Sequence, residues 1–199
     1  MTRPFVIGLT GSIGMGKSTT LGMFAEAGLP VWDADAAVHR LYAAGGDAVG
    51  PIGQLWPPAI VDGAVDRQQL KDWMQTDPTA LPRIERIVHP LVAADRDRFI
   101  AGQQAPMVVV DVPLLFETGG AARVDHVVVV TAPPEVQKAR VMARPGMTEA
   151  LFATILAKQM PDAEKRSRAD NLVVTDDMDS ARQQVADLLR RLGKDAPHA

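Results

Sequence analysis

Residues 11–18 constrain the fold of this chain more than any other segment. They read Gly-Ser-Ile-Gly-Met-Gly-Lys-Ser and fit the pattern G-x-x-x-x-G-K-[ST]. A continuous apolar run, residues 5–10, comes directly before the segment, and apolar residues at helical spacing follow it over residues 17–27. A glycine-rich turn that fitted this pattern by chance would not need to follow an apolar strand and to precede a helix. The sequence therefore predicts a buried strand, a tight loop and a helix in succession.

Each residue type in this loop has a mechanical role in binding phosphate. Glycines let the backbone curl so that successive N–H groups point at one oxyanion, and the following helix directs its positive dipole end at the same place. Lys17 has the length to reach the β- and γ-phosphates, and the Ser18 hydroxyl can ligate Mg²⁺. The segment predicts a nucleoside triphosphate site, with contacts from Gly11, Ser12, Ile13, Gly14, Met15, Gly16, Lys17, Ser18 and Thr19.

Four more short apolar runs alternate with helical patterns along the chain. The runs cover residues 29–32, 107–112, 126–130 and 172–175. Continuous apolar strands of this kind are typical of a parallel sheet that is covered on both faces. Strands that alternate with helices indicate a three-layer α/β/α fold with a five-stranded parallel sheet. Ligands of such sheets bind at the carboxyl ends of the strands.

Residues 45–106 break this alternation. Turn-forming dipeptides, among them Pro57-Pro58 and Asp62-Gly63, come first, and helical patterns follow at residues 67–75 and 79–100. We find no strongly strand-like run in this part of the sequence. We therefore expect a mostly helical insertion in the sheet domain, and a flexible tail at residues 194–199.

Composition narrows the class of protein. The 199 residues contain no cysteine, which excludes disulfides, thiolate zinc sites and thiol nucleophiles. The formal net charge of −3 argues against a non-specific nucleic-acid binder, which needs a large basic field. No apolar run reaches the roughly 18 residues of a membrane span, and the N-terminus carries no signal-peptide pattern. We expect a cytoplasmic monomer or small homo-oligomer that binds neither nucleic acid nor membrane.

Asp33 follows the second predicted strand, and it is the candidate general base. A carboxylate at that end of the sheet lies close to the phosphate loop and can accept the proton of an acceptor hydroxyl that attacks the γ-phosphate. If the backbone stays extended, alternation places Asp33 and Asp35 on the same side. For Asp35 the structural alternative is that it caps the next helix.

Two acidic residues follow the third predicted strand. Asp111 ends that strand, where nucleotide-binding enzymes often hold a carboxylate that reaches Mg²⁺ directly or through water. The alternative for Asp111 is a structural bond to the phosphate loop. Glu117, a few residues later, either faces the acceptor or is a solvated loop residue.

Arg140 and Arg144 are the candidate cations over the transferred phosphoryl group. They lie four residues apart on a predicted helix and would share a face, so two guanidinium groups can clamp migrating negative charge. Pro145-Gly146 directly beyond offers the hinge that a closing lid needs. The alternative is a solvated helix surface.

Other charged residues have simpler explanations. His89 precedes a proline in the insertion, and a lone histidine is more often structural than a ligand contact. Lys165, Arg166 and Arg168 form a basic cluster that is most simply the solvated face of a helix.

Taken in order, these segments resemble one enzyme family. The chain is similar to bacterial dephospho-CoA kinases from about residue 5 to about residue 190. The resemblance rests on Ile7-Gly8-Leu9-Thr10-Gly11, Asp33-Ala34-Asp35, Asp62-Gly63, Asp66-Arg67, Ile87-Val88-His89-Pro90-Leu91, Asp111-Val112-Pro113-Leu114-Leu115-Phe116-Glu117, residues 140–144, Gln159-Met160-Pro161, Lys165-Arg166 and Ala169-Asp170.

The resemblance implies phosphorylation of the ribose 3′-hydroxyl of dephospho-CoA, with ATP as donor and Mg²⁺ as cofactor. It implies a nucleotide-binding core at residues 1–44, 107–139 and 169–193, a helical acceptor domain at 45–106 and a lid at 140–168. Asp33 takes the place of the proposed base, and Arg140 that of the lid arginine facing the phosphates. The acceptor would be bordered by Arg67, His89, Leu114, Leu115, Phe116 and Glu117.

The chain departs from the family pattern at several positions. Ser12 stands where a glycine is expected in the phosphate loop, and Pro145 replaces the acidic residue that usually begins the lid turn. Thr154 occupies a position where a lid arginine is common, which weakens the expected phosphate clamp. Residues 171–176 differ from the family's usual ending, where adenine contacts are expected.

Three competing functions share the phosphate loop. Another small-molecule kinase, of the nucleoside monophosphate or shikimate type, is disfavoured by the insertion that carries Asp66-Arg67 and His89-Pro90. A GTPase switch or assembly factor should carry Asn-Lys-x-Asp, which is missing, and the D-x-x-G match at residues 47–50 does not end a predicted strand. A transport ATPase should carry Leu-Ser-Gly-Gly-Gln, which is missing too.

Overall fold

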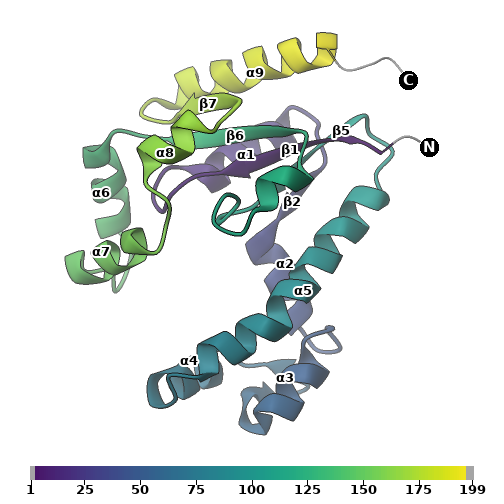
Figure 1. Cartoon of the computed structure of the whole chain (residues 1–199), viewed down its shortest axis with the longest axis vertical. Coiled ribbons are helices and arrows are strands. Elements are labelled where there is room, and N and C mark those ends of the chain that lie inside the picture. Colours follow the sequence, from purple (N-terminus) through teal and green to yellow (C-terminus); the bar gives the residue numbers. More distant parts are fainter. Residues whose placement is uncertain (1–2, 196–199) are drawn as a thin grey trace. The chain divides into compact units, whose positions relative to one another are not determined.

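The computed structural model describes residues 3–195, and the chain forms two compact units. One unit comprises Met1–Val31 and Gln103–Ala199, and the other comprises Trp32–Gly102. Figure 1 shows the helices and strands of each unit. None of the helices within the described residues is long and apolar enough to cross a bilayer.

A five-stranded sheet is the main feature of the first unit, although Trp32 and Asp33 of its edge strand are assigned to the second. Its strands are β2 (Val31–Asp33), β5 (Met107–Asp111), β1 (Phe5–Thr10), β6 (His126–Thr131) and β7 (Asn171–Val174), in that spatial order. Strand β1 pairs in parallel with β5 and β6, and β6 pairs in parallel with β7. The predicted α/β fold with its five-stranded sheet is confirmed.

Side chains of the central strands alternate between two apolar clusters because successive residues of a strand face opposite ways. Val128 and Val130 pack with helices α1 (Lys17–Glu26) and α9 (Met178–Asp195). Val127 and Val129 pack with Leu115 in a second cluster, formed with the segment that follows β5. Both faces of the sheet are therefore covered, which explains why its strands read as unbroken apolar runs.

Three short helices lie between β6 and β7: α6 (Pro134–Met142), α7 (Glu149–Ala157) and α8 (Asp162–Ser167) (Figure 1). Gly146 has a φ of 74° in the turn before α7, and the Thr148 hydroxyl caps α7 by accepting from the amide of Leu151. An ion pair of 2.7 Å between Lys138 and Glu149 joins α6 to α7. Both are exposed, so this pair contributes little stability.

Helices make up most of the second unit. They are α2 (Ala34–Tyr42), α3 (Val49–Leu55), α4 (Arg67–Thr76) and α5 (Ala80–Ala101), with a 3₁₀ turn η1 (Pro57–Ala59). Their apolar faces meet in one cluster around Ile52, Trp73 and Ile84, which are buried. The Trp56 ring stacks on Trp73 with centroids 4.9 Å apart.

A short β-hairpin accompanies the helices of this mostly helical unit. Strands β3 (Ile60–Val61) and β4 (Ala64–Val65) pair in antiparallel fashion. The two residues between them, Asp62 and Gly63, have φ angles of 51° and 78°. Positive φ at both central positions is the hairpin turn that Asp-Gly favours, so the dipeptide had marked a hairpin and not only a break.

The start of α2 contradicts the expectation for Asp35. Asp33 and not Asp35 is the N-cap, because its Oδ1 accepts from the Ala36 amide at 2.9 Å. The helix begins at Ala34, so extended alternation does not continue to Asp35, which lies in the first helical turn. At the other end of the chain, α9 extends through Asp195, and residues 196–199 of the expected tail lie outside the described residues.

Candidate active site

The loop between β1 and α1 adopts a conformation that only glycine accommodates at three positions. Gly14 and Gly16 have φ angles of 80° and 87°, which disfavour any side chain. A Cβ atom on Gly14 would lie 2.4 Å from Val141 Cγ2, and one on Gly11 would lie 2.6 Å from the Val130 carbonyl oxygen. The loop is thus packed tightly against β6 and α6. Ser12, which departs from the family pattern, is 4% exposed.

Several backbone amides of this loop can bind an anion. Within the described chain, the amides of Gly14, Gly16 and Lys17 have no hydrogen-bond acceptor, whereas the Met15 amide donates to the Ser12 carbonyl at 3.2 Å. These amides belong to the loop that opens α1, where the helix dipole also favours negative charge. The phosphate-binding geometry expected from the sequence is therefore present in the loop itself.

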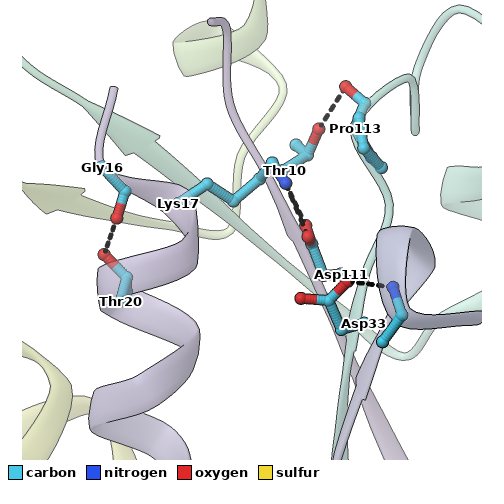
Figure 2. Close-up of polar contacts among 8 residues, drawn as sticks. Thr10, Gly16, Lys17, Thr20, Asp33, Asp111 and Pro113 are labelled. Atoms are coloured by element: carbon cyan, nitrogen blue, oxygen red, sulfur yellow. Dashed lines mark hydrogen bonds and ion pairs between the residues drawn. The ribbon is translucent and has the colours of Figure 1, made fainter. Parts of the chain in front are cut away.

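Lys17 and Asp111 form an ion pair at this loop. The Lys17 Nζ atom lies 2.6 Å from both carboxylate oxygens of Asp111 (Figure 2). The Lys17 side chain is 16% exposed and that of Asp111 is 5% exposed. Of the two roles expected for Asp111, the bond to the phosphate loop is observed. Ser18 and Thr19 follow on the exposed side of the first turn of α1.

The segment after β5 is attached to β1 at its carboxyl end. The Thr10 hydroxyl donates to the Pro113 carbonyl at 3.2 Å (Figure 2). Beyond this bond Leu114 is 40% exposed, whereas Leu115 is fully buried in the cluster under the sheet. Phe116 packs partly buried against the same cluster. Of these three apolar side chains, Leu114 is the most available to a ligand.

The Glu117 side chain is paired and 18% exposed, so it is not simply solvated, although the residue as a whole is exposed. Its Oε1 atom lies 2.9 Å from Lys165 Nζ and accepts from the Met160 amide at 2.8 Å. Burial acts to raise the pKa of Glu117, but Lys165 and the Met160 amide outweigh burial and hold the pKa below the ordinary glutamate value. Lys165 is completely buried, so its assignment to a solvated helix face was wrong.

We expect Lys165→Met to destabilise the protein by about 2 kcal/mol, because it removes a hydrogen bond between charged groups whose cation is fully buried. Chemical unfolding at neutral pH measures this loss. Glu117→Gln/Lys165→Met should recover part of it, since neither charge then remains. Equal stability of Lys165→Met and the wild type would show that the pair contributes nothing.

Acid should weaken the same pair. Because the folded-state pKa of Glu117 is lowered, its contribution to stability is complete above the ordinary glutamate pKa and is lost as pH falls through the lowered value. Glu117→Gln should therefore show a shallower loss of unfolding free energy over that acidic range.

The two candidate phosphate-clamping arginines do not share a helix face. Helix α6 ends at Met142, so Arg144 lies in the following turn, and the expectation of one helix carrying both is wrong. Arg140 is held by Thr175: its Nη1 donates to the Thr175 hydroxyl at 2.9 Å, and its Nη2 donates to the Thr175 carbonyl. The Thr175 hydroxyl in turn donates to the Met15 carbonyl at 2.7 Å, which links Arg140 to the phosphate loop.

Two glutamines, one on α6 and one after α7, hold Ile13 of the phosphate loop. Gln137 on α6 donates through Nε2 to the Ile13 carbonyl at 2.7 Å. Gln159, after α7, accepts from the Ile13 amide at 3.1 Å through Oε1. No local sequence pattern marks either residue as part of the site. The resemblance had included Gln159 only within a family motif.

The other expected acceptor residues lie in the second unit. Arg67 is the first residue of α4, and its guanidinium lies 5.7 Å from the centroid of the Tyr42 ring. His89 is exposed on α5. Asp33, also in this unit, uses Oδ1 to cap α2 and leaves Oδ2 outside that bond.

Comparisons with known proteins agree with one another. A family model described as dephospho-CoA kinase matches residues 5–181. The dephospho-CoA kinase of Cereibacter sphaeroides is 57% identical over 194 residues, covering 98% of both chains. That of Ruegeria pomeroyi is 58% identical over 195 residues, covering 98% of this chain and 99% of the relative.

Solved structures extend the similarity to the fold. The Thermus thermophilus protein TT1252 is 32% identical with a TM-score of 0.82, covering 96% of this chain and 98% of that one. Dephospho-CoA kinase from Campylobacter jejuni shares the fold at 20% identity, with a TM-score of 0.69 and coverage of 96% and 98%. Shikimate kinase from Acinetobacter baumannii, at 16% identity and a TM-score of 0.56, covers 98% and 96% and shares the fold alone.

Proposed function

The chain belongs to the dephospho-CoA kinase family and catalyses the ATP-dependent phosphorylation of dephospho-CoA in coenzyme A biosynthesis, and we propose which of its residues divide that work. The observation that carries the proposal is the Lys17–Asp111 contact beside a loop of available amides. These groups supply positive charge and oriented N–H donors to the donor phosphates.

Asp33 is the proposed general base. In the proposed step, the hydroxyl oxygen of the acceptor forms a bond to the γ-phosphorus, and Asp33 takes the proton of this hydroxyl. The bond from that phosphorus to the oxygen of the β-phosphate breaks, and ADP leaves with the electron pair. Support comes from the position of Asp33 at the end of β2, a strand of the central sheet, with Oδ1 fixed by the α2 cap. Lys17 and the loop amides stabilise the charge that develops on the phosphates.

Residues of the loop and of β5 fit a role in holding Mg²⁺. No cluster of three or more acidic or histidine side chains that could hold a metal is found within residues 3–195. Magnesium at kinase sites needs no such cluster, since a few protein oxygens, substrate phosphates and water complete its coordination. We propose the Ser18 hydroxyl and the Asp111 carboxylate as the protein ligands. Held by these residues, Mg²⁺ would supply positive charge that neutralises the phosphates during transfer.

The remaining residues are proposed to hold the acceptor and to close the lid. Arg67 suits the pyrophosphate of dephospho-CoA because a guanidinium binds such oxygens with two parallel hydrogen bonds. The exposed Leu114 suits an apolar part of the acceptor. The contacts of Glu117 with Lys165 and Met160 support a role in positioning Leu114.

We propose direct roles for His89 at the acceptor and for Arg140 and Arg144 at the phosphates. The proposed division is a nucleotide core at residues 1–44, 107–139 and 169–193, an acceptor domain at 45–106 and a lid at 140–168. The cytoplasmic location and the monomeric or small homo-oligomeric state stay predictions.

A coupled ADP-release assay tests the acceptor. ADP release should depend on dephospho-CoA and should not rise above background with shikimate or a nucleoside. If ATP turnover in folded protein is indifferent to dephospho-CoA, the assignment of the acceptor fails. If shikimate instead increased ADP release, the result would favour a shikimate-type acceptor.

A further inference from the structure

We infer that Gln159 is a positioning residue. Its side chain accepts a hydrogen bond from one backbone amide of the phosphate loop, and a phosphate oxygen takes over this hydrogen bond when a triphosphate binds. The Gln159 Oε1 atom lies 3.1 Å from the Ile13 amide nitrogen, and the two residues are 146 positions apart in the chain. Nothing local to the loop provides this acceptor. It is brought there by the segment that follows α7.

The Ile13 amide belongs to the donor set that phosphate needs. It directly precedes the amide of Gly14, which has no acceptor in the described chain, and it lies in the same curled backbone. Successive amides of such a loop point toward one anion. One N–H group makes one good hydrogen bond, so a phosphate oxygen at Ile13 competes with the Gln159 carboxamide.

The surroundings of Ile13 keep the loop still while its hydrogen-bond acceptor changes. Gln137 Nε2 holds the Ile13 carbonyl at 2.7 Å, and Gln137 is 7% exposed. This second bond, on the opposite polar group of the residue, does not involve a donor that phosphate uses. Exchange at the amide can therefore occur without rotation of the Ile13 backbone.

The backbone next to Gln159 is also fixed. The Met160 amide donates to Glu117 Oε1 at 2.8 Å, and Glu117 is paired with the buried Lys165 at 2.9 Å. Only the half-buried Gln159 side chain then has to move. Because hydrogen bonds to charged acceptors are about twice as strong as bonds to neutral ones, an anionic phosphate oxygen displaces a neutral carboxamide.

Removing the competitor should strengthen nucleotide binding. In Gln159→Leu, adenosine 5′-(β,γ-imido)triphosphate should bind about 2- to 10-fold more tightly than in the wild type, the range that a net neutral hydrogen bond supplies. Titration calorimetry without acceptor measures this dissociation constant. Gln137→Leu, which removes the bond to the Ile13 carbonyl, is the matched control and should not tighten binding. Equal or weaker binding by folded Gln159→Leu overturns the inference.

A measurement on the wild-type chain tests the exchange directly, even if the variants fold poorly. The nitrogen of Ile13 and the carboxamide carbon of Gln159 should show a through-hydrogen-bond NMR coupling that disappears when inorganic tripolyphosphate is added. A coupling that persists at saturation would contradict the displacement. The inference rests on the loop as a triphosphate site and not on the acceptor, so it can fail while dephospho-CoA-dependent ADP release is intact.

Discussion

Asp33→Asn should lower kcat by about 10²- to 10⁴-fold, the usual contribution of a general base. Asparagine has nearly the same shape and is an equally good helix N-cap, so the bond from the Ala36 amide to position 33 and helix α2 should persist. The loss should therefore fall on turnover and not on folding. Steady-state kinetics with dephospho-CoA measures kcat, and thermal unfolding reports any change in stability.

The neighbouring carboxylate provides a matched control. Asp35 lies in the first turn of the same helix, so Asp35→Asn removes an equal charge from nearly the same place without removing the cap. Its kcat should stay within about 3-fold of the wild type, and both variants should bind an ATP analogue within about 2-fold of it. Near-normal turnover in Asp33→Asn would remove Asp33 as the base. Equal losses in the two variants would indicate a general electrostatic effect of charge at this helix end.

Lys17→Met should lower kcat by about 10²- to 10³-fold, comparable to the loss of one preorganised group that stabilises transition-state charge. The substitution keeps an unbranched apolar stem and deletes the ammonium group that lies 2.6 Å from Asp111. The transferred phosphoryl group then loses the charge that the loop lysine directs at the β- and γ-phosphates. Single-turnover measurements with saturating ATP separate this loss from weaker binding.

Two further lysine variants show whether kcat depends on the ammonium group of Lys17 itself or only on positive charge. Lys17→Arg keeps the charge but replaces a compact ammonium by a planar fork, so it should recover little of the activity. Lys138→Met removes a lysine whose ion pair with Glu149 is exposed, and its kcat should stay within about 2-fold of the wild type. If Lys17→Met keeps more than about a tenth of wild-type turnover, the proposed role of Lys17 is wrong.

The donor half of the site was predictable because its signals are local. The loop at residues 11–18, the strand before it and the helix after it are neighbours in the sequence, and the structure has them as expected. The parallel sheet was predictable in the same way, since unbroken apolar runs that alternate with helices indicate such a sheet. The hairpin at Asp62-Gly63 also has a local signal, since Asp-Gly favours the positive φ angles of a two-residue hairpin turn.

Other features had no local signal. Lys165, Arg166 and Arg168 look alike in the sequence, yet only Lys165 is fully buried, because Glu117 lies against it. Burial of a lysine needs a partner charge, and that partner lies 48 positions away in the chain. The contact of Arg140 with Thr175 likewise has no local signal, because the two residues are far apart in the chain.

The sequence by itself determined the family, the parallel sheet and the phosphate loop, including its Lys17. Hydrophobic periodicity and the backbone freedom of glycine act within a few residues, so they can be read in order along the chain. Tertiary structure alone decided that Lys17 meets Asp111, that Glu117 meets a buried Lys165, and that Gln137 and Gln159 hold Ile13. These pairs join residues far apart in the sequence, and which polar group finds which partner depends on how whole helices and strands pack.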